Sequence, residues 1–150
     1  MCIISREATI NALRRMKDFH RDTKLLYSFY GMNLLDDLGR RNVIMSSAQE
    51  KFFADALGRD RAQSVGTSGQ PDIIVSDDSG PIEIECKLIT RSKGGSIAFQ
   101  TDYATLAKKR NLDYLYVVAD PNFDEFAVLY FTCLTLADFR EPSASSRGKA

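Results

Sequence analysis

Asp72, Glu85 and Lys87 bring two carboxylates and one amine close together in the sequence. They lie in the short segments Pro71-Asp72 and Glu85-Cys86-Lys87, on either side of a polar run. Two carboxylates placed close together repel each other unless a cation lies between them, and hard oxygen ligands suit Mg²⁺. An amine beside such an ion can orient a bound water or offset charge on a phosphoryl group. The pattern therefore favours metal-dependent hydrolysis of phosphodiesters.

The residues around these side chains predict a β-hairpin. Residues 71–75 are mostly apolar, and residues 82–89 alternate between apolar and polar side chains. Successive side chains of a strand point to opposite faces, so Glu83, Glu85 and Lys87 share the polar face. Glu83 is an extra carboxylate there, either near the site or simply solvated.

The turn of the hairpin decides how Asp72 pairs with the second strand. Asp77-Asp78-Ser79-Gly80 has turn-forming residues and allows two registers. A two-residue turn at Ser79-Gly80 would place Asp72 opposite Lys87, and one at Asp78-Ser79 would place it opposite Glu85. Either register puts Asp72, Glu85 and Lys87 on one face.

This pattern resembles the catalytic signature of the PD-(D/E)xK nuclease superfamily, which includes restriction endonucleases, Holliday junction resolvases and repair nucleases. The resemblance covers residues 46–139 and implies that Asp72 and Glu85 bind Mg²⁺, for which Mn²⁺ could substitute. It also implies that Asp72, Glu85 and Lys87 are catalytic. The backbone carbonyl of Cys86, and not its thiol, would be a further metal ligand.

The resemblance adds two catalytic residues on helices. Glu50 matches the acidic residue of a preceding helix and would be a further candidate metal ligand, and Gln100 matches a glutamine on the following helix. Glu50 also has a structural alternative. Ser47-x-x-Glu50 is a capping box, in which the glutamate bonds back to the N-terminus of its own helix.

We expect an α/β fold with a restriction-endonuclease-like core, in which helices flank a central mixed β-sheet. Residues 1–45 would form an N-terminal helical extension packed on a core of residues 46–139, with a polar tail at 140–150, all within one domain. Hydrophobic periodicity and capping residues predict helices at 5–19, 23–38 with Gly39 as the stop, 47–57 and 96–110. Strands at 112–119 and 126–133 are apolar on both faces, which predicts burial.

Two polar loops flank the proposed site and are candidates for DNA contacts. The loop at 59–70 offers Arg59, Arg61 and Ser68, and the loop after the hairpin offers Arg91 and Lys93. The alternative is that these side chains are only solvated.

Composition is that of a single-domain intracellular enzyme. The chain has 150 residues, of which 44% are hydrophobic and 27% are charged, and its formal net charge is +0. Three cysteines without metal-ligand spacing predict reduced thiols, and no segment is long and apolar enough for a membrane span. We therefore expect a cytoplasmic protein of prokaryotic or phage type, without a membrane partner.

Missing residues exclude other mechanisms. His20 is the only histidine, which excludes paired-histidine catalysis and His-metal nuclease sites. The chain also lacks a glycine-rich phosphate-binding motif, so we expect no nucleotide cofactor.

The favoured function is a restriction-endonuclease-like hydrolase that cuts double-stranded DNA. The alternatives are a Holliday junction resolvase or repair nuclease of the same superfamily, and an inactive DNA-binding module. Because one small domain carries one site and a double-strand break needs two cuts, we expect a homodimer. Leu25, Tyr27 and Phe29 are candidate interface residues.

Overall fold

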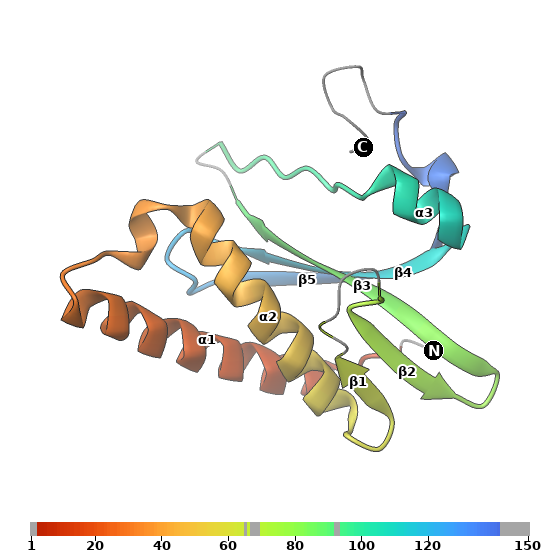
Figure 1. Ribbon diagram of the computed structural model, residues 1–150, viewed down its shortest axis with the longest axis horizontal. Helices are drawn as coiled ribbons and strands as arrows, with labels where there is room; N and C mark the ends of the chain where they lie inside the picture. Colours follow the sequence, from red (N-terminus) through yellow and green to blue (C-terminus); the bar gives the residue numbers. More distant parts are fainter. Residues whose placement is uncertain (1–2, 65, 67–69, 92–93, 142–150) are drawn as a thin grey trace.

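The computed structural model describes residues 3–64, 66, 70–91 and 94–141 and has an α/β architecture built on a five-stranded mixed sheet (Figure 1). No helix in the described part of the chain is both long and apolar enough to cross a bilayer. The elements in chain order are α1 (Arg6–Phe29), η1 (Leu34–Asp36), α2 (Leu38–Leu57), β1 (Ala62–Ser64), β2 (Ile73–Asp77), β3 (Gly80–Thr90), α3 (Tyr103–Lys109), β4 (Leu112–Ala119), β5 (Phe126–Leu134) and η2 (Leu136–Asp138).

The sheet follows the chain order, β1-β2-β3-β4-β5, and only the β3–β4 pair is parallel. The predicted hairpin is formed by β2 and β3. Asp77 pairs with Gly80, so the two-residue turn is Asp78-Ser79. Of the two registers that the sequence allowed, this is the one that carries Asp72 toward Glu85.

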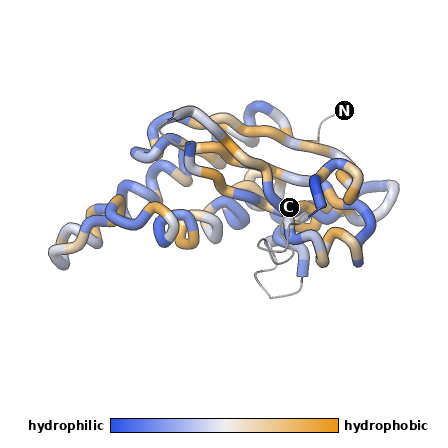
Figure 2. The backbone as a smooth tube through the Cα atoms, turned by 90° about the horizontal axis from the view of Figure 1, so that it is seen from above, coloured by the Kyte–Doolittle hydropathy of each residue, from blue (hydrophilic) through white to orange (hydrophobic). Residues whose placement is uncertain are grey.

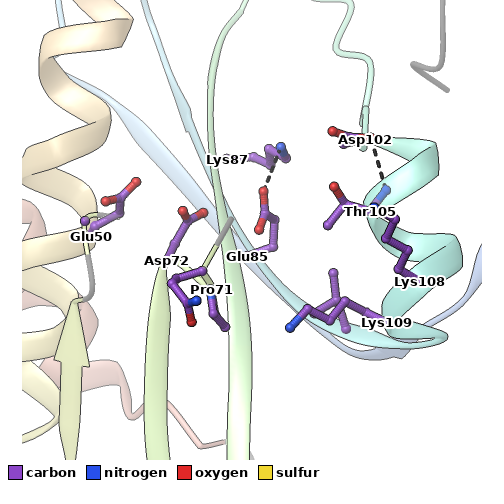
Figure 3. Close-up of a pocket in the computed structure, with 12 residues that line it drawn as sticks. Glu50, Pro71, Asp72, Glu85, Lys87, Asp102, Thr105, Lys108 and Lys109 are labelled. Carbon is purple, nitrogen blue, oxygen red and sulfur yellow. Dashed lines mark hydrogen bonds and ion pairs between the residues drawn. The ribbon is translucent and has the colours of Figure 1, made fainter. Parts of the chain in front are cut away.

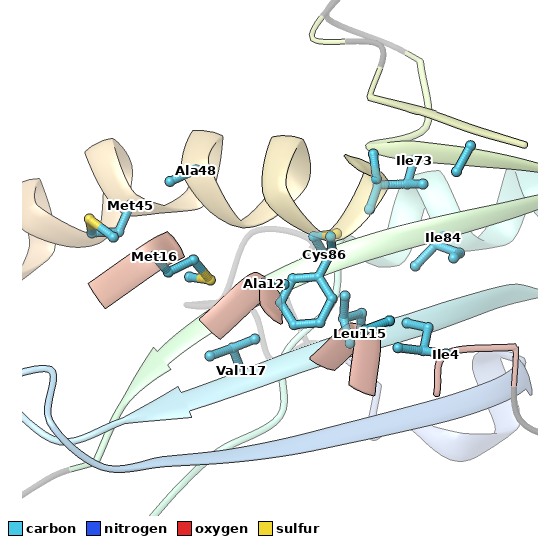
Figure 4. Packing of buried hydrophobic residues seen from close by; sticks show 14 of the residues in the cluster. Ile4, Ala12, Met16, Met45, Ala48, Ile73, Ile84, Cys86, Leu115 and Val117 are labelled. Carbon is cyan, nitrogen blue, oxygen red and sulfur yellow. The ribbon is translucent and has the colours of Figure 1, made fainter. Parts of the chain in front are cut away.

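Two apolar clusters cover opposite faces of the sheet. Ile84, Cys86 and Leu115 point to the face packed by α1 and α2, where Met16 and Phe53 are fully buried (Figure 4). Tyr114 and Tyr116, which alternate with Leu115 along β4, point to the other face and pack with Leu106 of α3. The alternation of strand side chains thus puts Glu85 and Lys87 on the α3 side of β3.

The N-terminal helical region differs from the two helices predicted at 5–19 and 23–38. One helix, α1, runs without a break through residues 20–22, because no glycine or proline interrupts it and the hydroxyl of Thr23 bonds to the carbonyl of Phe19 at 2.7 Å. The helix ends at Phe29, with Tyr30 as its C-cap, and the next residue, Gly31, has φ +76. The predicted stop at Gly39 is wrong, since that residue lies in the first turn of α2.

The start of α2 corrects a second expectation. The helix begins nine residues before the predicted 47–57, and its N-cap is Asp37, whose carboxylate accepts from the Arg40 N–H at 3.0 Å. Ser47 therefore lies inside the helix and cannot form the capping box with Glu50. The boundary expected between an N-terminal extension and a core, at residues 45 and 46, falls within this helix.

The remaining elements are only partly as predicted. The strand at 112–119 is confirmed as β4, whereas β5 is less buried than expected, because it is an edge strand that pairs only with β4. The predicted loop at 59–70 contains the short edge strand β1. The helix predicted at 96–110 is reduced to the seven residues of α3, which begin only after Asp102 caps the helix.

The far end of α1 extends past the ends of the strands (Figures 1 and 2) and carries apolar side chains in contact with solvent. Leu25 is 62% exposed and Phe29 is 82% exposed. These are two of the three residues expected at a dimer interface, and the homodimer stays a prediction.

Candidate active site

The three residues of the sequence motif come together in one pocket. Asp72, Glu85 and Lys87 line a cavity of ≈ 540 Å³ together with Glu50 (Figure 3). Glu50 enters from α2, Asp72 from the segment before β2, and Glu85 and Lys87 from β3. The opposite wall is the short helix α3.

A backbone hydrogen bond fixes Asp72 beside β3. The amide of Cys86 donates to Oδ2 of Asp72 at 2.8 Å. Asp72 is one residue and Cys86 two residues beyond the last β2–β3 pair, Ile73 with Ile84. The carboxylate thus takes the position that a further ladder partner would occupy. The amide and carbonyl of one strand residue point toward the same neighbouring strand, so the Cys86 carbonyl also points to the Asp72 side.

Glu85 and Lys87 form an ion pair along β3. They are two residues apart on the same face, with Lys87 Nζ 3.1 Å from Glu85 Oε1. Their side chains are 23% and 30% exposed, so both are partly shielded from water yet reachable from the pocket. Any anion that entered the pocket would meet this ammonium beside the carboxylates.

The carboxylates are difficult to ionise together. Burial, and then repulsion from Asp72 and Glu85, raises the pKa of Glu50 to about 7. The interaction between Glu50 and Asp72 raises the pKa of Glu50 further and lowers that of Asp72, so Glu50 holds a proton more readily than Asp72. Burial raises the pKa of both Asp72 and Glu85 as well, although the Cys86 amide and Lys87 oppose the shift at Asp72 and Lys87 opposes it at Glu85.

This donor set fits a hard divalent cation in its chemistry. Carboxylate oxygens are the ligands that Mg²⁺ prefers, and a cation would relieve the repulsion that raises these pKa values. In the part of the chain that the structure describes, however, no three acidic, cysteine or histidine side chains already form a metal-binding group. Asp72, Glu85 and the Cys86 carbonyl would hold the ion, with Glu50 as a further ligand after it loses its proton.

The thiol of Cys86 is not available for this role. It points into the core between the sheet and the helices, and burial raises its pKa well above the ordinary value. A neutral thiol on the far face of β3 leaves only the backbone of Cys86 for the pocket.

The other predicted site residues do not gather here. Gln100 lies in the segment before α3, not on a helix, and lines a separate pocket on the other side of Lys87. Its carbonyl accepts from the Tyr116 hydroxyl at 3.2 Å. Arg59, Arg61 and Arg91 are exposed and are not among the described residues lining the active-site pocket, while Ser68 and Lys93 lie outside the described residues.

Sequence reasoning missed the residues that α3 contributes. Asp102, Thr105, Lys108 and Lys109 line the wall facing the carboxylates. Asp102 serves mainly as the N-cap, and the Thr105 N–H that it accepts lowers the pKa of its carboxyl. The Lys108-Lys109-Arg110 run is visible in the sequence, but the position of these lysines opposite the carboxylates depends on how α3 packs on the sheet, which the sequence does not show.

Gln49 was also missed. It is fully buried on α2, and its Nε2 donates to the backbone carbonyls of Lys87 and Leu115, each at 3.2 Å. No pattern in the sequence distinguishes this glutamine from a solvated one.

Comparison with known proteins gives no match: no family model, curated protein or solved structure matches the chain.

Proposed function

We propose that the chain is a metal-dependent endonuclease with a restriction-endonuclease-like core that hydrolyses phosphodiester bonds in double-stranded DNA. One observation carries the proposal. Glu50, Asp72, Glu85 and Lys87, which come from three separate segments of the chain, line a single pocket. Solvated residues of a hairpin would have no reason to meet a half-buried glutamate of α2.

The chemistry follows from these side chains. A bound Mg²⁺ would supply positive charge to the phosphoryl oxygens and to an attacking water. Asp72 and Glu85 would provide its oxygen ligands, and the hydrogen bond from Cys86 holds Asp72 in place for this role. The reaction forms one bond from the water oxygen to phosphorus and breaks one phosphorus–oxygen ester bond, whose oxygen leaves with a proton.

Two groups of the chain can assist this exchange. Lys87 is held by Glu85 at the pocket, where its ammonium can offset charge on the phosphoryl group and orient the water. Glu50, with a pKa of about 7, can accept or release a proton near neutral pH. Neither role requires a histidine.

The deciding experiment is cleavage with matched variants. Asp72→Asn and Glu85→Gln should abolish Mg²⁺-dependent cleavage and leave the fold intact, because each removes a ligand charge and no apolar contact. Asp102→Asn is the control, since it makes the same charge change in the same pocket but keeps an N-cap residue. It should retain activity within a few-fold.

Substrates are tested in parallel: linear duplex, supercoiled plasmid and a synthetic four-way junction. Preference for the junction would replace the restriction-type substrate with that of a resolvase. Undiminished cleavage in excess chelator, or by both ligand variants, would refute the metal mechanism. DNA binding without cleavage on all three substrates would leave a binding module.

A further inference from the structure

We infer that Lys108 and Lys109 of α3 form a phosphate-binding wall that receives the backbone of the nucleic acid opposite the carboxylates. This inference deepens the proposed function and rests on it for the choice of nucleic acid as ligand. It concerns a wall of the pocket to which the motif assigned no residue.

Most acidic side chains of the pocket lie on one wall and most basic ones on the other, with Lys87 and Asp102 as the exceptions. Glu50, Asp72 and Glu85 lie on the side of α2 and the hairpin, whereas Lys108 and Lys109 lie on the side of α3 (Figure 3). A ligand that contacts both walls must present negative charge to the lysines of α3. On its other side it must bind a cation held by the carboxylates. A phosphodiester has this chemistry, because its oxygens can contact lysines and a divalent ion at once.

Neither lysine forms an ion pair with Glu50, Asp72 or Glu85. Lys109 Nζ is 3.2 Å from Glu83 Oε1, and both side chains are 36% exposed. Lys108 is exposed and forms no ion pair with any residue that the structure describes. Exposed ion pairs are weak, so an entering phosphate could displace Glu83 at little cost.

The position of α3 supports a fixed wall. Leu106 is fully buried against Tyr114 and Tyr116 of β4, and Asp102 caps the helix start. The helix is therefore anchored to the strand next to β3, which carries Glu85 and Lys87. Lys108 and Lys109 follow Leu106 within two to three residues. Their positions relative to Glu85 and Lys87 are therefore fixed by the packing of α3 on β4.

The test is DNA binding in chelator, measured by fluorescence anisotropy of a labelled duplex over a range of salt concentrations. Lys108→Gln/Lys109→Gln should weaken binding roughly tenfold, the scale of two exposed charge contacts. It should also reduce the slope of log affinity against log salt by about two. The matched control is Lys17→Gln/Lys24→Gln, with the same charge change on exposed positions of α1. It should leave the slope unchanged.

A second variant gives the opposite sign. Glu83→Gln should tighten binding several-fold because it releases Lys109, and this gain should disappear in the Lys109→Gln background. A gain that persists without Lys109 would be a general charge effect and would overturn the role of that residue.

The outcomes separate this inference from the proposed function. If DNA affinity depends equally on salt in the wild type and in the α3 double variant, and Mg²⁺-dependent cleavage is intact, the phosphate wall alone is overturned. A reduced slope in a protein that never cleaves would support the wall and remove the nuclease. No DNA binding by the wild type would overturn the inference. Circular dichroism confirms that each variant is folded.

Discussion

Gln49 and Lys87 are joined by a hydrogen bond from the Gln49 side-chain amide to the Lys87 backbone carbonyl, with Nε2 and O 3.2 Å apart. The same amide donates to Leu115 on the neighbouring strand, and the Gln49 Oε1 has no partner within the described residues. Since Glu50 is the next residue of α2, this contact fixes the helix that carries Glu50 against the strand that carries Lys87. Gln49 thus joins α2 to β3 and β4 beside the pocket.

Gln49→Met should therefore affect both stability and rate. The variant removes two buried hydrogen bonds and keeps a side chain of similar length, so we expect a loss of about 1 to 3 kcal/mol in the free energy of unfolding. The cleavage rate at saturating DNA should fall while KM changes little. Urea unfolding and single-turnover kinetics measure the two effects, and Gln63→Met, at an exposed position of β1, is the control. An unchanged rate would limit Gln49 to a structural role.

Lys87→Ala should lower the rate of the chemical step by roughly two to four orders of magnitude, the scale of a positioned acid–base or charge-stabilising group. DNA affinity should be largely retained. Lys51→Ala is the matched control, because it also removes a lysine from an ion pair, here with Asp55 of the same helix at 3.0 Å, and Lys51 is not among the described residues that line the pocket. Single-turnover cleavage at saturating Mg²⁺ is the measurement, and a rate within a factor of three of wild type would contradict a catalytic Lys87.

Divalent metal should stabilise the folded chain independently of any DNA. At a concentration one hundred times Kd, Mg²⁺ or Mn²⁺ should add about 2.7 kcal/mol and raise Tm by several degrees. Removal with chelator should reverse the shift. In Asp72→Asn and Glu85→Gln the shift should shrink or vanish, and metal-free Tm should rise, because one of the mutually repelling carboxylates is gone. Differential scanning calorimetry would record both changes, and a wild-type Tm insensitive to metal would argue against the site.

His20 should make the fold acid-sensitive. Burial, together with the nearby charges of Arg41 and Lys24, lowers its pKa from 6.5 to about 4, and the residue as a whole is 4% exposed. Below pH 6.5 His20 is therefore protonated in the unfolded chain, whereas in the folded chain it stays neutral until the pH falls to about 4. The contribution of neutral His20 to the free energy of unfolding is complete above pH 6.5 and is lost as the pH falls to about 4.

His20→Gln tests this assignment because glutamine can still accept from Arg41 Nη1, which lies 3.3 Å from His20 Nε2. Between pH 6.5 and 4 the variant should lose about 2 to 3 kcal/mol less stability than wild type. Denaturant unfolding across this range measures the difference. Parallel curves for the two proteins would show that His20 titrates normally.

The sequence was informative where side-chain alternation and turn chemistry act locally. The alternation of 82–89 predicted which face carries Glu85 and Lys87, and the turn residues limited the hairpin to two registers. Only the structure selects between these registers. Strand β4 was predicted with its correct bounds because an apolar run between polar residues has little alternative to burial.

Helix boundaries were harder because several residues can cap. Asp37 and Ser47 are both good N-cap residues, and the choice of Asp37 depends on tertiary contacts of the turns that follow it. Arg41 is one example: it is fully buried and bonds to the carbonyl of Pro121 at 2.8 Å, a partner far away in the chain. The roles of Gln49 and of the α3 lysines likewise depend on long-range neighbours that periodicity does not reveal.

The register of the β2–β3 hairpin makes the pocket sensitive to the number of residues in the two strands. The pocket is much less sensitive to which side chains form the turn. Asp78 and Ser79 are exposed at the far end of the hairpin, where many residue types would serve. Deleting one residue from β2 would instead turn Asp72 toward the face now occupied by Ile73, inside the apolar core. For a chain of this design, insertions and deletions within these strands are therefore far more damaging than substitutions at their tip.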